Sequence, residues 1–189
     1  MRKSQFKDIV ASEISRDGIN DLMQYIESRD FFIAPASTRF HNAFDGGLVD
    51  HSINVYDALM RIDNAFQLHL KSESMAICGL FHDLCKMDFY TKTRRMGHDK
   101  WGNRIAQDVY EINELMPLGH GEKSVILLER FMQLTPSEMY AIRWHMGAFD
   151  NAVKGGERSI NNAFDKCPLA VALHMADMAA TYLMESEAS

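Results

Sequence analysis

Histidines and aspartates in marked surroundings are the residues of this chain best suited to chemistry. The sequence contains eight histidines, and each one taken alone is more simply read as a structural or surface residue. Four of them stand out because glycines or the end of an apolar segment lie beside them: His51, His82, His120 and His145. His82 is followed directly by Asp83, which places an imidazole next to a carboxylate. These contexts together indicate one site assembled from distant segments.

A further carboxylate, Asp177, lies in the strongly apolar stretch from Leu169 to Ala180. Burying a carboxylate in such a helix costs free energy unless the group is paired or bound to a metal. Imidazole and carboxylate ligands together suit Mn, Fe, Co, Ni and Zn. His174, one helical turn earlier, is expected to be a core residue or to support a ligand. The residue types therefore predict a centre for a divalent transition metal.

The ordered set of motifs resembles the HD-domain superfamily of metal-dependent phosphohydrolases. The resemblance covers residues 39–183 and is carried by His51 in GGLVDHS, His82 and Asp83 in GLFHDLCK, His120 in PLGHGEKS, His145 in AIRWHMG and Asp177 in LHMADMAAT. Within the superfamily, the GGLxxHS segment and the later Gly-His element are most similar to small bacterial HD proteins related to the 3′→5′ exoribonuclease catalytic domain.

The resemblance implies a centre with six metal ligands. One ion would be held by His51, His82, Asp83 and Asp177. A second ion would be held by His120 and His145, with Asp83 bridging the two. The metal is left open among Fe, Mn, Ni, Co and Zn. The alternative for His120 and His145 is that they line the pocket over a single ion and bind substrate phosphate.

The activity that the resemblance implies is hydrolysis of a phosphate ester. A phosphohydrolase or phosphodiesterase of this kind acts on a nucleotide or related ester through a metal-activated hydroxide, with Asp83 and Lys86 as catalytic residues. Two other readings remain open. One is a di-iron oxygenase, which uses the same ligand set within the superfamily. The other is a catalytically silent HD domain that binds a ligand.

Residues for substrate binding are expected near the centre. Lys86 resembles a lysine that many HD proteins place against phosphate, although it also suits the negative end of a helix. Arg39 and His41 precede the glycine pair, where polar groups often face the pocket. Arg94, Arg95 and Trp101 belong to a cationic segment that suits an anionic substrate with a stacked base, or that is simply a solvated loop.

The elements that must position these residues are helices, because alternation typical of strands is scarce. Helices are predicted at 5–15, 19–29, 48–70, 73–84, 122–134, 135–147 and 168–184. Thr135 to Glu138 forms a capping box with proline at the first helical position. Residues 88–103 are expected to be a surface loop beside the site. The fold predicted is all-α, a single-domain HD-type helical bundle.

Length and composition limit the partners. The 189 residues fit one domain over 1–189, with N-terminal helices and an approach loop at 1–38 and a metal-binding core at 39–183. A net charge of −6 argues against an extended nucleic-acid surface, but a short single strand or a small phosphate ester remains compatible. Three cysteines without a CxxC pair favour a reducing, cytoplasmic compartment. No signal peptide or membrane span is evident, and a homodimer is compatible with the sequence.

Overall fold

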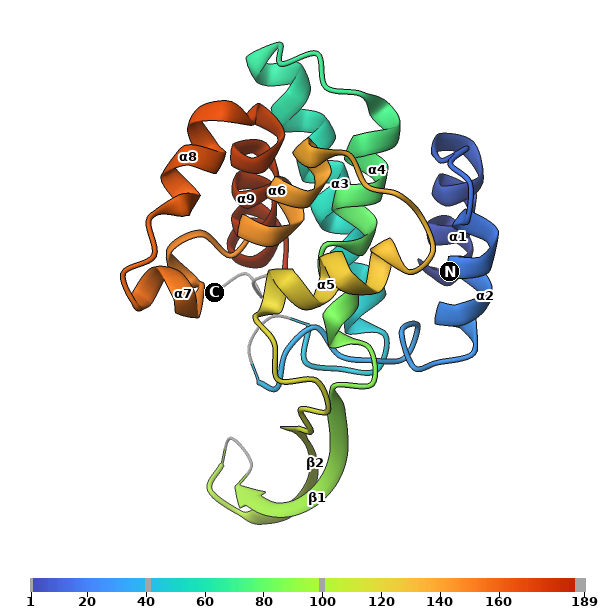
Figure 1. Ribbon diagram of the computed structural model, residues 1–189. Coiled ribbons are helices and arrows are strands. Elements are labelled where there is room, and N and C mark those ends of the chain that lie inside the picture. Colours follow the sequence, from blue (N-terminus) through green and yellow to red (C-terminus); the bar gives the residue numbers. More distant parts are fainter. Residues whose placement is uncertain (1, 40–41, 99–100, 186–189) are drawn as a thin grey trace.

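A bundle of helices forms the body of the protein, and a two-stranded hairpin projects from it (Figure 1). The computed structural model describes residues 2–39, 42–98 and 101–185. The helices that pack around the centre of the bundle are α3 (Gly47–Phe66), α4 (Ser72–Phe81), α5 (His120–Glu129), α6 (Pro136–Trp144) and α9 (Pro168–Ala179). The predicted helical fold is therefore confirmed.

The N-terminal helices α1 (Arg2–Glu13) and α2 (Ile19–Glu27) lie together at one side of the bundle (Figure 1), where α1 packs against α3 and α4. Their buried side chains, which include Phe6, Leu22 and Ile26, belong to the same hydrophobic cluster as the central helices. The Phe6 ring packs edge-on against Phe81 with ring centroids 5.4 Å apart. The first 27 residues thus help to close the core.

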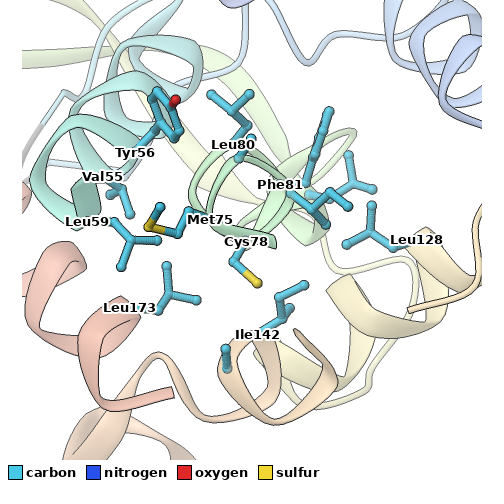
Figure 2. Packing of buried hydrophobic residues seen from close by; sticks show 14 of the residues in the cluster. Val55, Tyr56, Leu59, Met75, Cys78, Leu80, Phe81, Leu128, Ile142 and Leu173 are labelled. Atoms are coloured by element: carbon cyan, nitrogen blue, oxygen red, sulfur yellow. The ribbon is translucent and has the colours of Figure 1, made fainter. Parts of the chain in front are cut away.

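Helix α4 is the centre of the hydrophobic core, as its all-round apolar sequence predicts. Every residue from Ser74 to Phe81 is buried. Figure 2 shows its side chains surrounded by residues from four other helices: Val55, Leu59, Leu128, Ile142 and Leu173. Gly79 allows α3 to approach closely, because a Cβ atom at this position would lie 2.8 Å from the Tyr56 Cα atom.

Helix starts lie where they were predicted when the sequence contains a recognisable capping residue. Thr135 and Glu138 form the predicted capping box at the start of α6. Gly46 precedes α3 with a φ of 88°, a backbone conformation that favours glycine. Predicted C-terminal ends ran too far: α3 ends at Phe66, α5 at Glu129 and α6 at Trp144.

The expectation of a loop at 88–103 is wrong. Residues Tyr90–His98 (β1) pair in antiparallel register with Arg104–Ile112 (β2), from Tyr90 opposite Ile112 to His98 opposite Arg104. Side chains on both faces of this hairpin are largely exposed, so the sequence lacks the apolar alternation of a half-buried strand. The connection spans residues 99–103, longer than the two-residue turn that gives the strongest hairpin signal.

Shorter elements complete the fold. They are the 3₁₀ turns Leu84–Lys86 and Gly147–Phe149, the helices α7 (Asn151–Lys154) and α8 (Ser159–Lys166), and a π-helical turn at Ala180–Met184. The three cysteines are buried free thiols. Within the described ranges, no single helix is long and apolar enough to cross a membrane. The helices Ser159–Lys166 and Pro168–Met184, which are bent by 106° relative to each other, are long and apolar enough only when they are taken together.

Candidate metal centre

Five helices bring the six predicted metal ligands together. His51 lies in the second turn of α3, and His82 caps the C-terminus of α4 with Asp83 immediately after it. His120 is the first residue of α5, and His145 caps the C-terminus of α6. Asp177 lies in the last turns of α9. The site thus forms where the ends of several helices meet.

Asp83 is the point where these side chains converge. Its Oδ1 atom lies 2.6 Å from His120 Nε2 and 3.5 Å from His145 Nε2. Its Oδ2 atom lies 2.6 Å from Lys86 Nζ, 3.5 Å from His82 Nε2 and 3.6 Å from His51 Nε2. The side chain is 3% exposed. A carboxylate in this position can reach all four histidines of the centre.

Three histidines are held with Nε2 directed into the cluster. The Nδ1–H of His82 donates to the Gly79 carbonyl at 3.0 Å, and that of His145 donates to the Ile142 carbonyl at 2.7 Å. His51 Nδ1 lies 3.0 Å from Glu185 Oε1. A hydrogen bond at Nδ1 leaves the lone pair on Nε2 for a metal ion.

A buried ring nitrogen that makes no hydrogen bond supports metal binding. His145 Nε2 is buried and makes no hydrogen bond to any part of the chain that the structure describes. Leaving such an atom unsatisfied costs about 1–3 kcal/mol, and a metal ion would satisfy its lone pair. The residues present therefore fit a bound divalent cation.

Three overlapping groups have ligand atoms within 4.8 Å of one another: His51, His82 and Asp177; His82, Asp83 and His145; and Asp83, Cys85 and His120. All six predicted ligands occur in these groups. Cys85 was not expected. Its Sγ atom lies 3.4 Å from His120 Nδ1, and burial, followed by the charge of Asp83, raises the pKa of its thiol to about 12.

The electrostatics of the cluster favour a cation. Burial opposes ionisation of Asp83, but Lys86 and the neighbouring histidines outweigh it and hold the pKa of this carboxyl well below its usual value. The pKa of Asp177 is likewise lowered, with His51 as the main favourable partner against burial. Burial would lower the pKa of His51, but hydrogen bonds to Asp177 and Glu185 raise it to about 9. Ionised carboxylates thus lie in a buried place that a divalent ion would neutralise.

A pocket of about 890 Å³ opens onto this centre. Asp83, Lys86, His120 and Asp177 line it at the cluster, and Glu185 lies beside them. Its other walls are mainly aromatic and sulfur-containing side chains with one more cation: Phe44, Met146, Phe149, Met178, Tyr182 and Lys154. This volume is within the usual range for small-molecule sites, so a substrate can reach the ligand atoms.

The predicted substrate residues are placed differently from one another. Lys86 lines the pocket against Asp83, whereas the exposed Arg39 is not part of its lining, and His41 lies outside the described residues. Arg94 and Arg95 are on β1, and Trp101 is in the connection to β2. Arg95 pairs with Glu111. A substrate role for these distal residues stays a prediction.

Sequence reasoning missed Glu185. Its carboxylate contacts His51 Nδ1 and accepts a hydrogen bond from Asn54 Nδ2 at 3.0 Å, and its side chain is 1% exposed. Eight positions separate it from Asp177, which in a regular α-helix would turn it about 80° away. The π-helical turn at Ala180–Met184 changes this phase. His174, which was expected to be a core residue or to support a ligand, contacts the backbone of a candidate ligand. Its Nδ1 atom lies 2.6 Å from the His145 carbonyl oxygen, at the C-terminal end of α6.

The geometry defines a class of protein: helical domains in which histidines and aspartates form a buried cluster at the ends of helices. The HD domain family model matches residues 48–177, a span that begins three residues before His51 and ends at Asp177. The match covers more than half of the chain, and the chain therefore belongs to the HD domain family. No curated protein and no solved structure shows a significant match to it.

Proposed function

We propose that the protein is a metal-dependent phosphohydrolase or phosphodiesterase that acts on a nucleotide or a related phosphate ester. The observation that carries this proposal is the position of Lys86. Its Nζ atom lies 2.6 Å from Asp83 Oδ2, among the candidate ligands, and its side chain lines the pocket. A buried ammonium group beside a cation site suits a phosphate group, which needs positive charge on more than one side.

The roles of the chain's own residues follow from their positions. A bound divalent cation would supply a Lewis acid and lower the pKa of a coordinated water. Asp83 would hold the cation and orient Lys86. Burial opposes protonation of Lys86, but the charge of Asp83 outweighs it and raises its pKa, so Lys86 stays protonated at neutral pH and can neutralise charge on the phosphate.

The remainder of the pocket supports a substrate with a flat apolar part. Phe44, Phe149 and Tyr182 offer aromatic surface, and each is about half exposed. Aromatic side chains stack readily on nucleobases. Lys154 adds a cation to the lining, which suits a second negative group. These features favour a nucleotide over a small aliphatic phosphate.

A panel of phosphate esters tests the proposal. Monoesters, diesters and nucleotides would be assayed with Mn²⁺, Ni²⁺, Co²⁺ and Fe²⁺, and we expect turnover in at least one combination. Asp83→Asn should abolish metal binding and turnover. Lys86→Met should keep metal and lower kcat by about 10²–10³, the usual loss for one group that stabilises a transition state.

The control is Glu27→Gln, a carboxylate in an exposed pair with Lys7 on the far side of the bundle. Full turnover by Asp83→Asn would refute the proposal. Oxygen uptake by the iron-loaded protein, with a mixed-valence EPR signal and no ester hydrolysis, would identify the oxygenase instead. Ligand binding without any turnover would identify the silent domain.

A further inference from the structure

The β1–β2 hairpin is the largest feature that the proposed function leaves unexplained. Side chains alternate between the two faces of a strand, and directly opposed residues share a face. The register therefore places one set of residues, rich in cations, on the same face: Lys92, Arg94, Met96 and His98 from β1, with Arg104, Ala106, Asp108 and Tyr110 from β2. We call this set the cationic face of the hairpin.

The hairpin differs in charge from the rest of the molecule. Residues 90–112 contain five lysines and arginines against three acidic residues, although the whole chain carries a net charge of −6. Lys92 is paired with Asp45 at 2.9 Å. Arg94 and Arg104 are exposed and form no ion pair with any residue that the structure describes. Positive charge is therefore available on the outer part of this face.

The base of the cationic face is hydrogen-bonded to the residue that follows the pocket-lining segment 42–44. Asp45 accepts hydrogen bonds from both Lys92 and Tyr110, and it follows Phe44, which lines the pocket. Farther out, Met96 is 59% exposed and Trp101, in the connection, is 74% exposed. Apolar and aromatic groups thus accompany the cations along the hairpin.

We propose that the cationic face of the hairpin binds a single-stranded nucleic acid whose end enters the pocket. Cations that follow a phosphate backbone, with aromatic groups for the bases, are the usual means of binding single strands. The acidic body would repel a long duplex, whereas a narrow strand can follow the hairpin alone. Cleavage of the strand rests on the proposed function, but binding does not.

Binding would be measured by the fluorescence anisotropy of labelled 12-nucleotide oligo-U RNA and oligo-T DNA in EDTA, which prevents metal-dependent cleavage. The test variant is the double charge reversal Arg94→Glu/Arg104→Glu. Its matched control is Arg61→Glu/Arg130→Glu, which makes the same charge change at exposed positions of α3 and the end of α5. Affinity should fall at least tenfold in the test variant and less than threefold in the control.

The salt dependence gives an independent readout. The slope of log K against log[salt] should decrease in magnitude by about 0.7 for each phosphate contact that the variant loses. Oligonucleotide should also quench tryptophan fluorescence, and Trp101→Ala should remove this quenching, because the other tryptophan, Trp144, is buried. Circular dichroism of each variant would show that the helical body is intact.

Several outcomes would overturn the proposal: no binding by the wild-type chain, equal losses in the test and control variants, or an unchanged salt slope. So would a concentration-dependent dimer that the test variant abolishes while oligonucleotide does not bind, because a second copy would then cover the hairpin. Binding in EDTA, with no cleavage of the strand and no turnover of any ester in the panel under any metal, would refute the proposed function and leave the hairpin proposal standing.

A different observation carries a second proposal, which concerns Glu185. This carboxylate is buried against His51 Nδ1, with its two oxygens at 3.0 and 3.2 Å. Asn54, one turn after His51 on α3, donates to the same group at 3.0 Å. We infer that Glu185 is a positioning residue that fixes the His51 ring with Nε2 directed at the metal. Partners of this kind orient a ligating histidine and strengthen it as a ligand.

Metal affinity, rather than activity, tests this role. Titration calorimetry with Mn²⁺ and Co²⁺ should show a 10–100-fold weaker Kd for Glu185→Ala, the usual loss when such a partner is removed. Glu185→Gln keeps an oxygen acceptor and should recover part of the loss. The visible spectrum of bound Co²⁺ should shift in Glu185→Ala, and the surface variant Glu27→Gln should match the wild type.

A Glu185→Ala protein that binds Co²⁺ with the wild-type Kd and spectrum would overturn the inference, whatever its thermal stability. Equal losses in Glu185→Ala and Glu185→Gln would show that the negative charge matters rather than the orientation of the ring. That result would also contradict a positioning role. If Glu185→Ala does not fold, Glu185→Gln still tests the proposal. If Glu185 had only a structural role, the spectrum of bound Co²⁺ would be unchanged in a folded Glu185→Gln protein.

Discussion

At the scale of single residues, we predict that His120 and His145 determine whether the centre binds one or two metal ions. Their ligand atoms lie on the side of Asp83 Oδ1, whereas Asp177 lies within 3.2 Å of His51 on the other side of the cluster. We expect two ions per chain in the wild type. The double variant His120→Ala/His145→Ala should retain one, held by His51, His82 and Asp177.

Equilibrium dialysis with Mn²⁺ followed by elemental analysis measures this number. The control is His69→Asn, which removes an exposed histidine whose φ of 57° asparagine tolerates. A wild-type chain that binds one ion, and a double variant that also binds one, would contradict a two-metal centre. The two histidines would then be pocket residues for substrate phosphate.

The candidate site could be predicted from the sequence where a ligand residue has unusual neighbours in the chain. His51 after two glycines, His120 between two, and Asp177 in an apolar helix could each be noticed, and all three belong to the overlapping ligand groups of the structure. Glu185 could not be found in this way. Its contact with His51 depends on the π-helical turn before it, and an α-helical periodicity directs it elsewhere.

At the scale of elements, the start of α6 depends on a buried ion pair. Glu138 is fully buried, closes the capping box, and receives two hydrogen bonds from Arg16, at 2.6 and 3.0 Å. Arg16→Met would leave this carboxylate without its cation and should lower the free energy of unfolding by about 3 kcal/mol. Urea denaturation measures the change. Lys7→Met, in the exposed pair with Glu27, should leave the free energy of unfolding almost unchanged.

The same pair gives a dependence on pH. Burial alone would raise the pKa of Glu138, but hydrogen bonds from Arg16, Ser74 and the Thr135 amide outweigh it and lower the pKa below the ordinary value of 4.5. A lowered pKa means that ionised Glu138 stabilises the fold fully above pH 4.5 and less as the pH falls through its folded-state value. In Glu138→Gln, the free energy of unfolding should therefore fall less steeply with decreasing pH. An unchanged pH dependence would contradict this role of Glu138.

The contact between α3 and α4 sets the spacing of His51 and His82. A Cβ atom at Gly79 would lie 2.8 Å from the Tyr56 Cα atom, so Gly79→Ala must push the two helices apart. We expect a loss of about 1–3 kcal/mol in stability and a weaker Kd for Mn²⁺. Thermal unfolding and calorimetry measure both. Gly155→Ala, near the C-terminus of α7 with its closest contact at 3.3 Å, is the control; equal effects would contradict this account.

Helices α4 and α6 could be predicted from the sequence, whereas the short helix α8 and the β1–β2 hairpin could not. Helix α4 was recognised because nearly all of its side chains are apolar and buried. The capping box of α6 fixed its start because Thr135, Pro136 and Glu138 have explicit roles. The β1–β2 hairpin was missed because neither face packs on the core, so burial never selected an alternating pattern.

At the scale of the whole molecule, the centre joins helices that are distant in sequence. Its ligands come from α3, the ends of α4 and α6, the start of α5, and α9. An ion bound to the folded chain alone would stabilise it by about 2.7 kcal/mol at a concentration 100 times Kd. The metal should therefore raise Tm, and chelation should lower it again.

Hydrogen exchange locates this stabilisation. Loading with Mn²⁺ should slow amide exchange in α3, α4 and α9, because opening any of them would break bonds to the ion. The hairpin supplies none of the candidate ligands in the described residues, so exchange in β1 and β2 should not change. Asp83→Asn provides the control, since its exchange should not respond to metal. Uniform protection of helices and hairpin, or the same response in Asp83→Asn, would show that the ion acts elsewhere than at the helix ends.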